Sequence, residues 1–238
     1  MSKNSSGPYA LLGLCFGGIT AFELGKRLEA RGHTLSFCGG LDVTPSLHDM
    51  LRISSDRSSI QLFLLDLLVY HKVITTDQLP ALEARFVPLP ETEAVAAIAE
   101  HFRSQGIEDA GLQAEKIEAW YRVNCMAQAV AKAHVPRGNV RCYDVFWAKP
   151  YETWSVGTSE WRDLVMGWDR FVRDGARYWE VEGHHFSLLD KENAERLAGT
   201  LVEAMGRREL ELVKVEGGER VVGKGLVVVN TKAVVEKV

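Results

Sequence analysis

Hydrophobic residues follow two different patterns along the first part of the chain. Short continuous apolar runs occupy Tyr9–Leu14 and Leu35–Leu41, while the apolar residues of Ile19–Arg31 recur at helical spacing. Continuous apolar runs of this length are typical of buried strands, and recurrence every three to four residues is typical of a helix. Residues 7–45 are therefore predicted to form a strand, a helix and a second strand.

The middle region, residues 46–134, has the periodicity of helices almost throughout. Ile60–Tyr70 is strongly apolar, and Glu91–Gln105 and Gln113–His134 show the spacing of amphipathic helices. We expect a long helical insertion here.

Residues 140–205 return to a pattern of alternating strands and helices. Val140–Ala148 and Tyr178–Val181 are predicted strands, and Lys191–Arg207 is a predicted helix. Strands that alternate with helices favour an α/β fold with a mostly parallel sheet.

The last segment, Leu210–Val238, has a different pattern. Its first residues alternate in polarity, Gly217 and Gly218 follow, and Leu226–Asn230 is rich in valine. This composition predicts a β-rich tail, including a hairpin.

The overall composition narrows the classes of protein that fit. With 238 residues and 46% hydrophobic content, the chain can form one domain with a core plus an appendage. A net charge of −4 gives no indication of nucleic-acid binding. No apolar run approaches the length of a membrane span, and the first seven residues are polar, unlike a signal peptide. We expect a cytoplasmic protein.

The four cysteines do not have the spacing of a metal or disulfide framework. Cys15, Cys38, Cys125 and Cys142 are scattered, with no Cys-x-x-Cys pair. This distribution predicts reduced thiols and no metal site.

Residues 13–18, Gly-Leu-Cys-Phe-Gly-Gly, have the form of a nucleophile elbow, G-x-S-x-G, with Cys15 in place of serine. The predicted strand before it and helix after it supply the context that this motif requires. Gly13 and Gly17 lack the Cβ atoms that would collide in such a tight turn. The turn would expose the Cys15 thiol and direct the Phe16 N–H toward a substrate carbonyl oxygen. The alternative is that Cys15 is a small buried side chain beside an ordinary glycine turn.

A nucleophile of this kind needs a base, and the base needs a carboxylate that orients it. Asp42 follows the second predicted strand, at the edge of a parallel sheet where functional groups gather. His185 follows the strand at Tyr178–Val181. The order Cys15, Asp42, His185 is nucleophile, acid and base.

Two assignments have rivals. His184 adjoins His185, although the spacing after Gly183 favours His185. Asp144, Asp163 and Asp169 compete with Asp42 as the acid, but Asp144 lies within a predicted strand and the other two lie among helix-like residues. We expect Asp42 and His185 to form the pair.

The sequence resembles the type I thioesterase domains, of the α/β-hydrolase family, that end nonribosomal peptide and polyketide synthases. Three segments carry the likeness: the elbow region from Gly7 to Leu24, the pair Gly167-Trp168, and the histidine segment with Gly183, His185, Phe186 and Leu189. The resemblance implies an α/β-hydrolase-like fold, with residues 46–134 as a lid over the substrate channel. It also implies a Cys15, Asp42 and His185 triad, with the Phe16 N–H in the oxyanion hole. Some members of the family carry cysteine as the nucleophile.

The start of the chain departs from the family pattern. In the family, several strands and helices precede the elbow, and one of their loops supplies the second oxyanion-hole N–H. This chain begins almost at the elbow strand, so we expect that donor to be missing from it. Losing one such donor costs roughly 3–4 kcal/mol of transition-state stabilisation.

The resemblance implies acyl transfer without a resident cofactor. The substrate would be an acyl or peptidyl thioester on the phosphopantetheine of a carrier protein, released by hydrolysis or cyclisation. The expected partners are that carrier protein, other domains of a synthase, or a second subunit. The rival hypothesis is a binding or scaffolding module that keeps the elbow without catalysis. We also expect the tail at 210–238 to cover the outer edge of the first strand, unless a second subunit covers it.

Overall fold

The computed structural model describes residues 8–53, 59–70, 73–104, 114–151, 154, 156–208, 213–215, 218–220 and 226–229. The chain separates into two compact units, which we describe in turn. The first combines Met1–Met50 with Val135–Val238, and the second is Leu51–His134.

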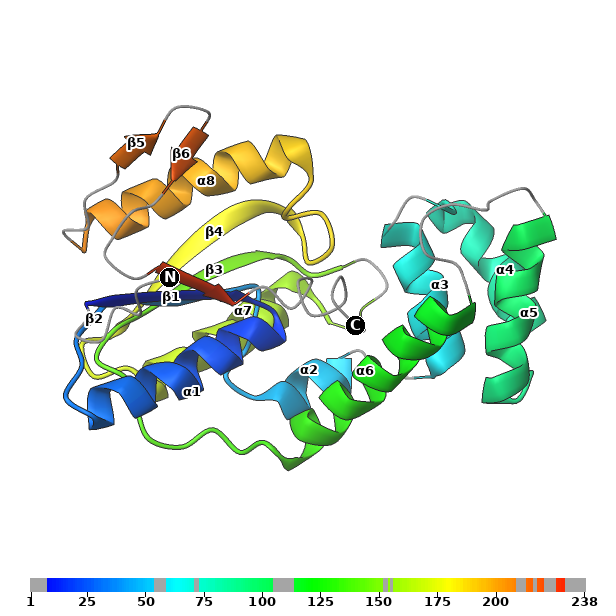
Figure 1. The fold of residues 1–238 in the computed structure, drawn as a ribbon, viewed down its shortest axis with the longest axis horizontal. Helices are drawn as coiled ribbons and strands as arrows, with labels where there is room; N and C mark the ends of the chain where they lie inside the picture. The colour runs from blue at the N-terminus through cyan, green and yellow to red at the C-terminus, as the bar shows by residue number, and fades with distance from the viewer. Residues whose placement is uncertain are drawn as a thin grey trace. The chain divides into compact units, whose positions relative to one another are not determined.

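The first unit is built on a parallel sheet with the strand order β4, β3, β2, β1, β7 (Figure 1). The bounds are β1 Tyr9–Leu14, β2 Leu35–Leu41, β3 Tyr143–Lys149, β4 Ala176–His184 and β7 Leu226–Val229. The first two strands match their predicted bounds residue for residue. The parallel sheet with its helices confirms the predicted α/β fold class.

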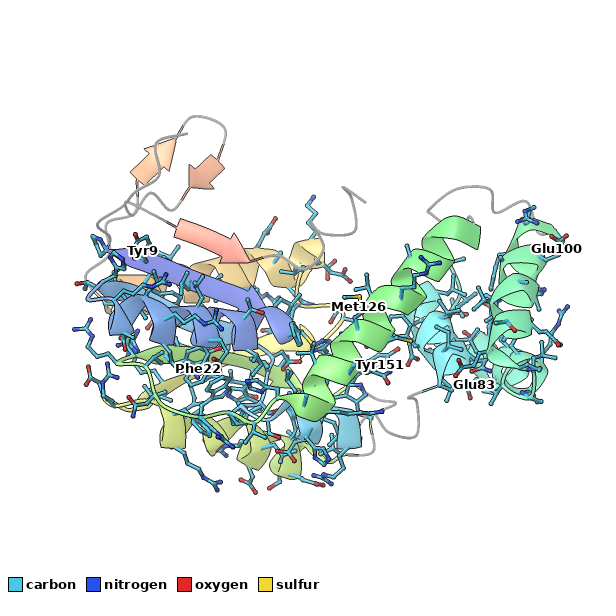
Figure 2. All side chains as sticks on the ribbon, turned by 60° about the horizontal axis from the view of Figure 1, so that its bottom comes forward. Tyr9, Phe22, Glu83, Glu100, Met126 and Tyr151 are labelled. Atoms are coloured by element: carbon cyan, nitrogen blue, oxygen red, sulfur yellow. The ribbon has the colours of Figure 1, made fainter. Side chains whose placement is uncertain are left out.

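Helices cover both faces of this sheet. Helices α1 (Phe16–Ala30) and α7 (Thr158–Met166) lie on one face, and α8 (Lys191–Gly206) lies on the other (Figure 1). Phe22 of α1 is fully buried and meets Tyr143 of β3 edge to face, among the side chains shown in Figure 2. Successive residues of a strand point to opposite faces of the sheet. The residues of β3 that alternate with Tyr143 therefore face α8.

Three predicted elements differ most from the observed ones. Helix α1 begins at Phe16 instead of Ile19, because the glycines of the elbow already belong to its first turn. Strand β3 begins at Tyr143 instead of Val140, which instead forms an isolated bridge with Val172. Strand β4 is longer than predicted because it lies at the sheet edge, where charged residues interrupt the apolar pattern that reveals a strand.

Two further helical segments complete this unit, α2 (Leu47–Ile53), which runs into the second unit, and the 3-10 helix η3 (Gly167–Phe171). The tail contributes the predicted hairpin, with β5 (Val213–Val215) antiparallel to β6 (Gly218–Arg220). Strand β7 folds back beside β1, pairing Ala10 with Leu226. The tail therefore covers the outer edge of β1, and the rest of Leu210–Val238 lies outside the described residues.

The second unit is helical, as its periodicity predicts. It contains α3 (Ile60–Tyr70), the 3-10 helix η2 (Thr76–Gln78), α4 (Leu79–Phe86), α5 (Glu91–Ser104) and α6 (Ala114–Ala133). Its core is apolar and buried, built from Ile60, Leu64, Leu65, Leu68, Ile74, Leu79, Phe86, Ile98, Ala99 and Phe102. Among the described residues, no helix combines the length and apolar character needed to cross a membrane.

Candidate active site

Cys15 occupies a sharp turn between β1 and α1. Its φ of 53° lies in a region that non-glycine residues rarely adopt, so the turn stores backbone strain. The turn closes only because Gly13 lacks a side chain: a Cβ there would lie 2.0 Å from the carbonyl carbon of Gly17. The Cys15 N–H donates to the carbonyl of Leu41 at 2.9 Å, which ties the turn to the end of β2. Strand, turn and helix thus fold as the elbow motif predicts.

Asp42 lies at the carboxyl end of β2 and is fully buried. Its φ of 50° makes it the second non-glycine residue with a positive φ in the described part of the chain. The main chain fixes it at both ends, since its N–H donates to Phe146 at 2.6 Å and its Oδ1 accepts the Ala148 N–H at 3.0 Å. Its other carboxylate oxygen, Oδ2, is left to hydrogen-bond with His185.

His185 follows β4 in a tight loop that a glycine makes possible. Gly183 has a φ of +92°, and a Cβ there would lie 2.6 Å from Nδ2 of Asn193. The His185 Nδ1 lies 2.8 Å from Asp42 Oδ2, and its side chain is 10% exposed. Because Nδ1 faces the carboxylate, the other ring nitrogen, Nε2, is left to hydrogen-bond with the Cys15 thiol.

The charges of this pair support each other. Burial raises the pKa of the Cys15 thiol, but the charge of His185, a hydrogen bond with its ring and the Phe16 N–H outweigh burial and lower it below 9.0. Burial lowers the pKa of His185, whereas the Cys15 thiolate and the hydrogen bonds to Asp42 and Cys15 raise it to about 10. Each charge therefore favours the other: the imidazolium lowers the pKa of the thiol, and the thiolate raises the pKa of the imidazole.

Phe16 is the first residue of α1, directly after the turn. Its N–H belongs to the helix N-terminus, where unpaired main-chain donors favour negative charge, and it is directed at the Cys15 sulfur. The same N–H is the donor that the sequence assigns to the oxyanion hole.

The rival residues have other partners. His184 Nδ1 accepts the Phe186 N–H at 3.3 Å, so its ring belongs to the local turn. Asp144 is fully buried and bound to Arg177 and Arg208. Asp163 is exposed, and Asp169 accepts a hydrogen bond from the Tyr178 hydroxyl at 3.0 Å. The described structure thus brings Cys15, Asp42 and His185 together and leaves these alternatives apart.

Sequence reasoning missed the residues that surround the acid and the base. Ala148 contributes only its main chain, for which no side-chain signal exists. Trp154 lies beside His185, with ring centroids 5.2 Å apart, and Trp161 packs against Trp154. The spacing of Trp147, Trp154 and Trp161, a local enrichment in tryptophan, is the sequence feature that could have indicated them. Among the described residues, no cluster of three or more His, Cys, Asp and Glu side chains could hold a metal ion.

Comparisons with known proteins show what the chain is similar to. Residues 2–204 match the family model of the thioesterase domain. The chain is 34% identical over 211 residues to the nonribosomal peptide synthetase atqA of Aspergillus terreus, covering 87% of this chain and 22% of that protein. It is 32% identical over 193 residues to the inactive atromentin synthetase invA4 of Paxillus involutus, covering 80% and 19%. The chain spans about a fifth of the length of these curated relatives.

A solved structure gives the same fold. The four-domain nonribosomal peptide synthetase holo-AB3403 superposes with a TM-score of 0.62 at 20% identity, over 84% of this chain and 14% of that chain. At this identity the likeness supports the fold alone, a parallel sheet with helices on both faces.

Proposed function

The chain belongs to the thioesterase domain family, and on that basis we propose that it releases an acyl or peptidyl chain from a carrier-protein thioester through an acyl-Cys15 intermediate. The observation that carries the proposal is the Cys15 thiol at a strained elbow, with a lowered pKa, beside a histidine held by a buried aspartate. A lowered pKa increases the share of thiolate, which is the nucleophilic form and attacks without first losing a proton.

Acylation uses the three groups in turn. The Cys15 thiolate attacks the thioester carbonyl carbon, and the carbonyl electron pair moves to the oxygen, which accepts the Phe16 N–H. When the intermediate collapses, the carbon–sulfur bond to phosphopantetheine breaks and the departing sulfur takes the proton of the His185 imidazolium. The products are a free carrier thiol, neutral His185 and a thioester on Cys15.

Deacylation reverses these roles. Neutral His185 removes a proton from the acceptor, which is water for hydrolysis or a nucleophile within the acyl chain for cyclisation. The acceptor attacks the acyl carbon and Cys15 leaves as a thiolate, which restores the starting pair. Since Cys15 keeps the acyl group as a thioester, the chain stays as activated as it was on the carrier. A serine nucleophile would hold it as a less reactive ester.

Asp42 orients the base through both steps. Its hydrogen bond to Nδ1 fixes the tautomer, and its charge stabilises the imidazolium. The carboxylate is itself held by the Ala148 N–H, so it cannot turn away from the ring.

The test is thioester cleavage measured as thiol release from acyl-N-acetylcysteamine and from acylated carrier protein. We expect the wild type to cleave the thioester, and Cys15→Ala to lose roughly 10³-fold or more of the rate with its fold intact. Cys15→Ser should keep part of the hydrolysis, since a hydroxyl beside His185 is also a usable nucleophile. Full activity in Cys15→Ala would exclude the mechanism. No cleavage of any thioester by the wild type would favour the scaffolding module.

A further inference from the structure

The part of the chain from the end of β3 to α7 contacts the candidate site at two points. At one end, the Ala148 N–H holds Asp42 Oδ1 at 3.0 Å. At the other, the Trp154 indole lies against the His185 ring, with centroids 5.2 Å apart and planes inclined by 48°. Neither contact involves Cys15.

Trp161 links these two points. Its Nε1–H donates to the Ala148 carbonyl at 3.0 Å, and its fully buried ring meets Trp154 edge to face with centroids 5.3 Å apart. The contacts therefore run from Asp42 to Ala148, to Trp161, to Trp154, to His185, and back to Asp42 through the 2.8 Å hydrogen bond. A closed ring of contacts of this kind restricts the movement of each member, because each residue in it contacts two others.

The imidazole needs such support. The hydrogen bond at Nδ1 fixes the distance to Asp42, and the orientation of the ring about that bond decides whether its other nitrogen reaches Cys15. Phe186 meets His185 edge to face at 5.2 Å, and Trp154 meets it from another direction. A tilt would carry the second ring nitrogen away from Cys15. Electron-rich indole also favours the charged imidazolium over the neutral ring.

We propose that Trp154 is a positioning residue for His185: its indole, braced by Trp161, holds the imidazole where one nitrogen meets Asp42 and the other meets Cys15. The inference rests on the proposed function, because it gives His185 the role of base. Trp154 acts through His185, and no contact with the substrate is assigned to it.

The charged groups around His185 make a pH profile informative. The groups that shift its titration are Cys15, on the elbow, and Asp42, after β2. Trp154, which lies between β3 and α7, and Phe186, the next residue after His185, pack against the ring and do not titrate. His184 is turned toward the Phe186 N–H. A change at Trp154 therefore alters the profile through the placement of the ring.

The experiment measures the rate of Cys15 alkylation by iodoacetamide against pH, together with kcat and KM for an acyl-N-acetylcysteamine thioester. For Trp154→Ala we expect the alkylation midpoint to move upward by about one pH unit, because a displaced ring stabilises the thiolate less. We expect kcat to fall roughly ten-fold, with KM for this short substrate unchanged. Trp154→Phe should restore most of both, because it keeps an aromatic ring beside the imidazole.

Two further variants separate positioning from packing. Trp154→Leu keeps apolar bulk and should show the same upward midpoint as Trp154→Ala. Trp179→Leu is the matched control: Trp179 is a partly buried tryptophan of β4 that stacks on Phe146, so its loss should leave the profile in place. Thermal unfolding of each variant is measured alongside.

The outcomes are distinct. A wild-type Cys15 that reacts only like an ordinary thiol contradicts the proposed function. A wild type with a low midpoint, matched by superimposable profiles for Trp154→Ala and Trp154→Leu, overturns the role of Trp154 and leaves the proposed function standing.

Discussion

Two buried aspartates on neighbouring strands have opposite surroundings. Asp42, just after β2, and Asp144, within β3, are both fully buried. Asp42 is bound to His185, whose charge can change, and to a main-chain N–H. Asp144 is bound to Arg177 at 2.7 Å and Arg208 at 2.8 Å, whose charges are permanent.

The partners decide what each carboxylate does. Arg177 belongs to β4 and Arg208 follows α8, so Asp144 joins β3 to both elements with charges that never change. It also accepts the Trp179 Nε1–H at 3.0 Å. In the proposed mechanism, Asp42 instead holds a ring that gains and loses a proton. Burial alone does not distinguish these two aspartates. They differ in whether the side chain bound to the carboxylate can lose its charge, as histidine can and arginine cannot.

The largest loss of activity is expected at His185, the partner of Asp42 whose charge can change. His185→Ala should lose roughly 10³-fold or more of thioester cleavage, close to the loss in Cys15→Ala, because the members of such an array act as a unit. His184→Ala should lose less than about ten-fold, since its ring serves a local turn. Steady-state rates for both variants measure the difference, and a larger loss for His184→Ala would reverse the assignment of the base.

Removing the charge of each aspartate in turn tests whether the two carboxylates have different roles. Asp42→Asn should lower kcat by about 10²–10⁴-fold with little change in unfolding free energy, because asparagine accepts a positive φ but sets the wrong imidazole tautomer. Asp144→Asn should lower the unfolding free energy by about 2–4 kcal/mol, less than a fully buried pair because Arg177 keeps 28% of its side chain exposed.

Urea unfolding and thioester cleavage, measured on both variants, separate these effects. If Asp42→Asn is silent and Asp144→Asn abolishes cleavage without loss of stability, the acid is Asp144.

The pH dependence follows from the same contrast. The pKa of Cys15 is lowered, so the thiolate is lost as the pH falls through that value. The pKa of His185 is raised to about 10, so the imidazolium that protonates the leaving sulfur is lost as the pH rises through about 10. We expect kcat/KM to be bell-shaped with an upper limb near pH 10.

The two aspartates should affect this bell differently. Asp42→Asn should move the upper limb downward, since the hydrogen bond to Asp42 is one cause of the raised pKa of His185. Asp144→Asn should leave both limbs in place. If the upper limb of the pH profile is unchanged in Asp42→Asn, the hydrogen bond between Asp42 and His185 does not raise the pKa of His185 as proposed.

The smallest effect is expected at the far edge of the sheet, away from both aspartates. Deleting residues 210–238 removes β7 and exposes the outer edge of β1, whose unpaired N–H and C=O groups then need another partner. We expect a lower melting temperature and a change of oligomeric state or solubility. Light scattering and thermal unfolding check this, and an unchanged mass with an unchanged melting temperature would show that the tail is only an appendage.

The parts of this site that sequence predicts are those set by local patterns. The glycines around Cys15 and the abrupt end of the apolar run before Asp42 are visible in a few adjacent residues. The structure brings these two residues and His185 together as expected. The residues that distinguish the two aspartates are not visible in this way, because Arg177 and Arg208 lie 33 and 64 residues from Asp144.

The supports of the site are hidden for a similar reason. Ala148 acts through its main chain, and Trp154 reaches His185 only after β3 and β4 pair. The extent of β4 is hidden because its edge position tolerates charged residues. Patterns of adjacent residues therefore predict which residues form the candidate site. The contacts that position those residues come from distant parts of the sequence and are not predicted in this way.

The central claim is that Cys15 carries the acyl group during turnover. Incubation with an acyl-N-acetylcysteamine thioester, rapid acid quenching and intact mass measurement test it directly, with peptide mapping to locate the modification. We predict a mass increase of one acyl group on the wild type, mapped to Cys15 and absent from Cys15→Ala. Steady cleavage of the thioester with no adduct at Cys15, or an equal adduct on Cys15→Ala, would contradict the account.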